Sequence, residues 1–109
     1  MKASAIGFNA EYAEDAPTYE DICQLTDDII LEFGAPWCGH CQAARSGIKA
    51  ELDGRSITHI KVSDGKGKKL GRKFGVKLWP TLILLRNGIE VRRIVRPLLK
   101  QEINDFLTR

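Results

Sequence analysis

The sequence has little cysteine and no long uncharged segment. Its three cysteines are an odd number in 109 residues, whereas secreted disulfide scaffolds carry a denser and even set. The longest stretch without Asp, Glu, Lys or Arg is the 12 residues 33–44, well short of the roughly 18 apolar residues of a membrane helix. The first residues also lack the apolar run of a secretory signal. We therefore expect a cytoplasmic protein without membrane contact, whose cysteines serve chemistry.

Size and charge favour one small domain. A chain of 109 residues and 12.2 kDa buries about two thirds of its unfolded surface, enough for a core without obligatory disulfides or metals. Residues 1–32 contain eight acids and one base, and the rest contains six acids and 16 bases. The basic cluster of residues 66–73 has no interleaved aromatic side chains except at its border, so we interpret it as a solvated helix face and expect no nucleic-acid partner.

Hydrophobic periodicity predicts alternating strands and helices. Residues 1–16 have no clear period and are expected to be an N-terminal lead-in with a short strand near residues 4–8, followed by one domain over residues 17–109. The predicted helices cover about residues 18–25, 39–52 and 67–74, and a terminal helix that begins near residue 98. The predicted strands cover residues 29–34, 57–62, 81–86 and 89–95, with Asn87-Gly88 as a hairpin turn.

This order of elements predicts an α/β fold. The central sheet is expected to be mixed, with four or five strands and helices on both faces. Right-handed crossovers make the first strand pairs parallel, and the hairpin adds an antiparallel edge.

The residues with the most distinctive spacing are Cys38 and Cys41. They lie at the junction between a predicted strand and a predicted helix, where positions i and i+3 bring two side chains within disulfide distance. Unpaired amides and the positive end of the helix dipole stabilise a thiolate on Cys38. We therefore predict that Cys38 is a nucleophile and that Cys41, one turn further in, resolves the mixed disulfide.

Two segments resemble a known family. Residues 32–41 read EFGAPWCGHC and are similar to the active-site segment of the thioredoxin superfamily, most of all to the catalytic domains of protein disulfide isomerase. Residues 74–81 read FGVKLWPT and resemble the loop that carries the family's cis-proline opposite the cysteines. The resemblance covers about residues 18–109 and implies a thioredoxin fold and exchange of disulfides in protein substrates.

The resemblance also implies roles for residues around the two cysteines. Pro80 matches the family's cis-proline, and with Trp79 and Trp37 it is expected to border the substrate. Glu32 matches a buried acid beneath Cys41, and Lys61 matches the lysine that pairs with it. Burial of an acid in an apolar strand is expected to raise the pKa of Glu32 toward a range useful for accepting the proton of Cys41. A salt bridge without a catalytic role is the alternative.

Other positions separate this chain from its family or lie outside the motifs. A protonated His40 between the cysteines favours the reduced form, so we expect a potential between about −270 and −180 mV, the values for thioredoxin and protein disulfide isomerase. Gly34 stands where thioredoxins usually have Trp, and Arg96 where a Gly normally lines the docking groove.

Cys23 is expected to be a small buried side chain and His59 to face solvent without a role.

The leading hypothesis is a thiol–disulfide oxidoreductase that reduces or exchanges disulfides in proteins. Its electron donor would be a thioredoxin reductase or glutathione, it needs no cofactor, and we expect a monomer. Two alternatives stay open: a metal-binding module that uses Cys38, Cys41 and His40, and a redox-silent scaffold that keeps the fold and docks a partner.

Overall fold

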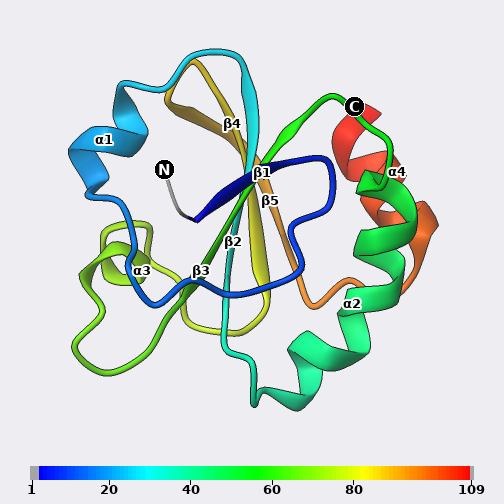
Figure 1. Ribbon diagram of the computed structural model, residues 1–109, viewed down its shortest axis with the longest axis horizontal. Coiled ribbons are helices and arrows are strands. Elements are labelled where there is room, and N and C mark those ends of the chain that lie inside the picture. Colours follow the sequence, from blue (N-terminus) through cyan, green and yellow to red (C-terminus); the bar gives the residue numbers. More distant parts are fainter. Residues whose placement is uncertain (1–2, 109) are drawn as a thin grey trace.

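The computed structural model describes residues 3–108 as one mixed sheet with helices on both sides (Figure 1). The elements in chain order are β1 (Ser4–Ile6), α1 (Tyr19–Cys23), β2 (Asp28–Gly34), α2 (Gly39–Leu52), β3 (Thr58–Ser63), α3 (Lys69–Lys73), β4 (Thr81–Arg86), β5 (Ile89–Val95) and α4 (Lys100–Thr108). Within these residues, none of the helices is both long and apolar enough to cross a bilayer.

The sheet has five strands in the order β1-β3-β2-β4-β5. β2 and β3 are parallel, and the other neighbouring pairs are antiparallel. The predicted fold is confirmed, with one difference. Only β2 and β3 form a parallel pair, and β4, which follows α3, is antiparallel to β2. The segment expected to be a lead-in supplies β1, and its Ala13 forms an isolated bridge to Val62 in β3.

The short helix α1 is held at its N-terminus by a capping box. The Thr18 side chain accepts a hydrogen bond from the Asp21 N–H, and the Asp21 carboxylate accepts one from the Thr18 N–H. A helix of five residues buries only one of its positions, Ile22. Cys23 lies on the next position around the helix and is exposed, so the prediction of a buried Cys23 is wrong.

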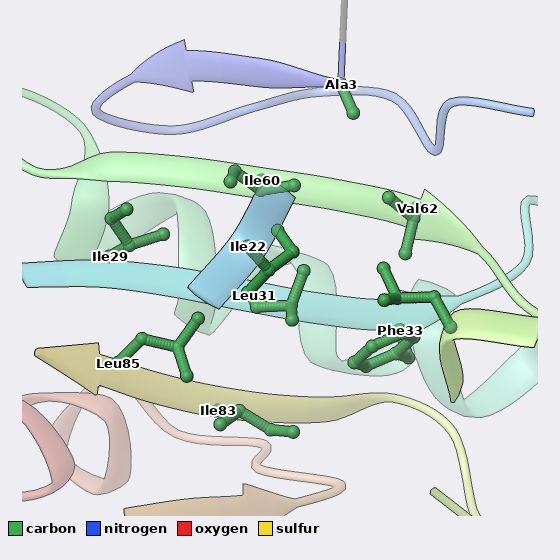
Figure 2. Packing of buried hydrophobic residues seen from close by; sticks show 10 residues of the cluster. Ala3, Ile22, Ile29, Leu31, Phe33, Ile60, Val62, Ile83 and Leu85 are labelled. Carbon is green, nitrogen blue, oxygen red and sulfur yellow. The ribbon is translucent and has the colours of Figure 1, made fainter. Parts of the chain in front are cut away.

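The α1/α3 face of the sheet carries a fully apolar core (Figure 2). Its buried side chains come from the residue before β1, from both helices and from β2, β3 and β4; they are Ala3, Ile22, Ile29, Leu31, Phe33, Ile60, Val62, Leu70, Ile83 and Leu85. Each large side chain buried in this way contributes about 1.5–3 kcal/mol to stability relative to an exposed one.

The α2/α4 face carries a second core made from the alternate residues of the same strands. Ile30, Leu82 and Leu84 pack there against α2 and α4. Gly47 in the middle of α2 is required by a close approach, because a Cβ at this position would lie 2.7 Å from the Leu98 carbonyl oxygen. The terminal helix, predicted to begin near residue 98, begins at Lys100, and Leu98 before it is exposed.

Candidate active site

The two motif cysteines lie where β2 leads into α2. Cys38 is the N-cap residue of α2, and its sulfur accepts a hydrogen bond from the Cys41 N–H at 3.3 Å. Cys41 lies on the first turn, and both are buried free thiols. The helix N-terminus and this N–H donor both direct partial positive charge toward the Cys38 sulfur. The structure therefore places Cys38 and Cys41 at the start of a helix, as expected from the sequence.

Cys41 is held as a protonated thiol. Burial and then the hydrogen bond to Cys38 raise the pKa of the Cys41 thiol to about 11, although the Ala35 backbone and the Tyr12 hydroxyl act in the opposite direction. At neutral pH this sulfur therefore carries its proton while Cys38 faces it. A base is needed before Cys41 becomes a nucleophile.

Glu32 lies in the middle of β2 and points to the α2/α4 face, as the alternation with Leu31 and Phe33 requires. The strand register places it opposite Lys61 of β3. Its hydrogen-bond partners, however, are His59, whose Nε2 lies 2.9 Å from Oε1, and the Tyr12 hydroxyl, which donates to Oε2.

Lys61 contributes to this site through its charge. Its ammonium donates to the Ala10 carbonyl oxygen at 3.2 Å and lies 4.3 Å from the centre of the Tyr12 ring. Burial lowers the pKa of Lys61, and the nearby Glu32 charge acts against that effect. The expected pairing with Glu32 is thus electrostatic, and the direct contacts to the carboxylate come from other residues.

The prediction of a raised pKa for Glu32 is wrong. Burial alone would raise it, but the hydrogen bond from His59, the positive charge of Lys61 and the hydrogen bond from Tyr12 together bring the pKa of Glu32 below its usual value. The carboxyl group is therefore charged at neutral pH, and its surroundings stabilise that charge.

His59 is fully buried, so the prediction of a solvent-facing residue without a role is also wrong. Its Nδ1 accepts the Asn9 N–H at 3.0 Å, which assigns the ring proton to Nε2 and makes that atom a donor to Glu32. The sequence contained a signal for this position. Ile60 and Val62 face the α1/α3 core, so the alternate residues His59 and Lys61 must face the helices on the other side.

Tyr12 is the site residue that sequence reasoning missed. Its hydroxyl donates a hydrogen bond to the Glu32 carboxylate and lies beside the Cys41 sulfur. Burial, followed by the Glu32 charge, raises the pKa of Tyr12 strongly. Residues 1–16 have no hydrophobic period that predicts this placement, and the one available signal was the unusual Gly34 beside it.

The aromatic residues and Pro80 lie on the outer side of the cysteines. Trp37 is 74 % exposed and meets the ring of Trp79 edge-on at 5.5 Å between centroids. The Trp79–Pro80 peptide bond is cis, and Trp79 packs against the two cysteines. His40 is exposed on the first turn of α2.

Two polar contacts hold Trp79 in place. Its Nε1 donates to the Asp64 carboxylate at 2.9 Å. Its carbonyl oxygen accepts a hydrogen bond from Arg96 Nε at 2.8 Å. Arg96 has a φ of 53°, a backbone conformation that favours glycine, which fits its occurrence where the family normally has Gly. The Arg96 side chain thus lies across the loop that carries the cis peptide bond.

A cavity of about 360 Å³ opens beside Cys41 on the inner side of the site. Its lining includes Tyr12, Pro36, Cys41, Gln42, Arg45 and Lys61. Water in such a polar cavity can exchange protons with the groups around Cys41.

Within residues 3–108, no three His, Cys, Asp or Glu side chains are grouped so that they could hold a metal ion. His40 therefore does not complete a ligand set with the two cysteines.

The family comparisons agree with this geometry. The sequence profile described as Thioredoxin matches residues 11–109. The chain superposes on the structure of thioredoxin 2 from Pseudomonas aeruginosa PAO1 in its reduced form with a TM-score of 0.81 and 40% identity, covering 92% of this chain and 94% of that one.

Curated relatives include two kinds of protein. Protein disulfide-isomerase from Gallus gallus is 33% identical over 67% of this chain, which spans 15% of that relative's length. "Probable thioredoxin-2" from Caenorhabditis elegans is 26% identical over 92% of this chain and 69% of that protein.

The fold, with a Cys-x-x-Cys dithiol at the start of α2, defines the class of thioredoxin-fold proteins. Within that class, the chain belongs to the thioredoxin family.

Proposed function

We propose that this chain reduces or exchanges disulfides in protein substrates, with Cys38 as the attacking and Cys41 as the resolving residue. The observation that carries the proposal is the position of Cys38 at the N-cap of α2, where its sulfur accepts the Cys41 N–H. A sulfur in this place is stabilised as a thiolate, the form that attacks disulfides.

The first step transfers the substrate to Cys38. The Cys38 thiolate forms a bond to one sulfur of the substrate disulfide, and the bond between the two substrate sulfurs breaks. The other substrate sulfur leaves with the electron pair and takes a proton from water.

In the second step, Cys41 loses its proton and its thiolate bonds to the Cys38 sulfur. The substrate sulfur then leaves, and the substrate has gained two electrons from the dithiol.

The order of the two steps follows from the causes of the high Cys41 pKa. Two of these causes, the hydrogen bond to Cys38 and the Cys38 charge, come from the attacking sulfur itself. When Cys38 joins a substrate, its negative charge disappears, and the Cys41 thiol is easier to deprotonate. Resolution is thus favoured only after capture has occurred.

The outer side of the site would take an extended substrate segment. Trp37 and Trp79 supply apolar contact area, and Pro80 places the Trp79 backbone beside the nucleophile. Arg96 adds a positive charge to the loop, so acidic segments around the substrate disulfide are favoured.

The proposal extends to the setting in which the chain works. A protonated His40 on the exposed first turn of α2 would favour the reduced dithiol and make the couple more oxidising. We propose a monomeric, cytoplasmic protein that receives electrons from a thioredoxin reductase or from glutathione.

Turnover of insulin disulfides tests the activity. Cys38→Ser is expected to abolish reduction, because the first bond cannot form. Cys23→Ser is the matched control: it removes the exposed third cysteine and is expected to leave the rate unchanged. Equal rates for wild type and Cys38→Ser would refute the proposal. The equilibrium of the Cys38–Cys41 pair against a glutathione buffer then gives the potential and the working direction.

A further inference from the structure

Three groups from distant parts of the chain form a continuous path beneath the dithiol. The Tyr12 hydroxyl, from the segment after β1, donates to Glu32 Oε2 of β2 and lies beside the Cys41 sulfur of α2. A hydroxyl donates one proton and accepts another, so it can connect a thiol to a carboxylate.

The space for this hydroxyl exists because residue 34 has no side chain. A Cβ on Gly34 would lie 2.5 Å from the Tyr12 oxygen and 2.7 Å from the Cys41 sulfur. Both distances are shorter than a carbon can tolerate. The glycine and the tyrosine therefore belong to one arrangement, in which Tyr12 occupies the region that a side chain at position 34 would fill.

The far end of the path is fixed by a second set of contacts. His59 donates to Glu32 Oε1, and the Asn9 N–H donates to His59 Nδ1. The Asn9 side chain also donates to the carbonyl oxygens of Ala3 at 2.6 Å and His59 at 3.1 Å. Glu32 thus has its Oε1 occupied by His59, and its Oε2 is directed to Tyr12.

We propose that Tyr12 is a third catalytic residue, whose hydroxyl carries the proton of Cys41 to Glu32 when Cys41 attacks the mixed disulfide. This proposal rests on the thiol–disulfide exchange proposed above and names the path by which the Cys41 proton reaches Glu32 in its second step.

The protons and electrons balance in this step. The Cys41 proton moves to the Tyr12 oxygen while the Tyr12 proton moves to Glu32 Oε2, so that Tyr12 is regenerated. The electron pair left on the Cys41 sulfur forms the bond to Cys38, and the pair of the breaking bond leaves with the substrate sulfur. Glu32 afterwards releases its proton to water, and the same path runs backward when the dithiol is restored.

The titratable groups around Tyr12 come from three elements. Glu32 of β2 faces its hydroxyl, Lys61 of β3 lies over its ring, and Cys41 of α2 lies on its other side. Arg45 of α2 acts on Lys61 from across the cavity. Burial, followed by the Glu32 charge, strongly opposes the formation of a tyrosinate at Tyr12. Tyr12 therefore acts by passing protons on and does not keep a charge.

The competing route is direct transfer to water in the cavity beside Cys41. The two routes are distinguished by measuring the two chemical steps separately. A suitable probe is a fluorescent peptide joined through a disulfide to nitrothiobenzoate. The aromatic thiol leaves first and reports capture by absorbance, because a thiol of lower pKa is the better leaving group. Release of the peptide then reports resolution by fluorescence.

Tyr12→Phe keeps the ring and removes only the hydroxyl. We expect capture to change less than twofold and resolution to slow about 100-fold, the low end for loss of a positioned acid–base group. The remaining rate should rise with pH, because solvent base must then deprotonate Cys41. Tyr19→Phe, which alters the only other tyrosine, is the matched control and is expected to resolve like wild type. Wild-type resolution in Tyr12→Phe, or slower resolution with the wild-type pH profile, would overturn the proposal.

Gly34→Ala tests the same path without removing the hydroxyl. Its methyl group displaces the Tyr12 oxygen, so resolution is expected to slow as it does in Tyr12→Phe, with little further loss in the double variant. Unaltered resolution in Gly34→Ala would contradict the role of the hydroxyl's position.

Wild-type protein provides a readout that no folding defect can affect. The resolution rate in mixtures of H₂O and D₂O should vary non-linearly with the deuterium fraction, because two protons move together. A linear dependence would indicate one proton and overturn the relay. Absence of capture by wild-type protein would instead refute the proposed function itself, which keeps the two failures distinct.

Discussion

The two faces of the sheet are built from the same strands but have opposite chemistry. On the α1/α3 face, β2 contributes Ile29, Leu31 and Phe33 to an entirely apolar core. On the α2/α4 face, the same strand contributes Ile30 and then Glu32, which enters a buried network with His59 and Tyr12. Alternation along one strand thus separates a structural face from a reactive one.

The polar network is confined to the end of the α2/α4 face that lies under Cys41. Every buried side-chain nitrogen and oxygen in the described part of the chain has a hydrogen-bond partner. The hydrogen bonds to the Glu32 carboxylate offset the free-energy cost of burying its charge. An isolated charge at this position would have no such compensation. The comparison predicts that changes on the apolar face alter stability, whereas changes in the network alter chemistry.

Leu31 and Glu32 are adjacent in β2 and point to opposite faces. Leu31→Ala leaves a cavity in the apolar core and is expected to lower the free energy of unfolding by about 2–5 kcal/mol. The resolution rate of the folded variant should stay at the wild-type value. Urea unfolding and the two-step peptide assay measure the two quantities. A large loss of resolution rate in the folded variant would contradict the separation of the faces.

His59→Leu removes the donor to Glu32 and the acceptor of the Asn9 N–H. We expect a loss of about 1–3 kcal/mol in unfolding free energy, because buried polar groups lose their partners. Slower resolution with an altered pH profile should accompany it. His59→Gln, which can still donate to the carboxylate, is the matched variant and should recover part of both losses. Equal behaviour of the two variants would show that only the volume of His59 matters.

Acid should destabilise the protein through Glu32. The pKa of Glu32 is lower in the folded than in the unfolded chain, so its ionisation stabilises the fold above the unfolded pKa. This contribution is lost as pH falls through the folded pKa. The difference in unfolding free energy between wild type and Glu32→Gln should therefore shift against wild type on acidification. Parallel pH profiles of the two proteins would contradict the assigned direction.

The smallest expected effect concerns the outer rim. Arg96→Glu reverses a charge beside Trp79 and is expected to slow capture of an acidic disulfide peptide several-fold, as changes of rim charges alter association rates. A neutral peptide should be captured at nearly the wild-type rate, and the difference should shrink at high salt. Equal slowing of both peptides would assign Arg96 a structural role on the Trp79 carbonyl.

The fold could be predicted from the sequence because its patterns are local. Apolar runs and the Asn87-Gly88 turn placed most elements within a residue or two of their observed bounds. The dithiol was found for the same reason, since its two members lie three residues apart.

The proton path could not be predicted because its members are joined only by tertiary packing. Tyr12 comes from a segment without periodicity, and its contacts to Glu32 span 20 residues. The wrong pKa direction for Glu32 had this cause: burial was visible in the strand pattern, and the donors were not. His59 was accessible to reasoning, since a sheet covered on both faces leaves no solvent-facing position in the middle of β3.

Trapping the covalent intermediate tests the central claim that Cys38 captures the substrate and Cys41 releases it. A disulfide peptide is mixed with Cys41→Ser protein, and the adduct is mapped by mass spectrometry after proteolysis. We predict a stable peptide adduct on Cys38 in this variant and none in Cys38→Ser. An adduct on Cys41 in the Cys38→Ser protein, formed as fast as the Cys38 adduct, would contradict the assignment of the two sulfurs.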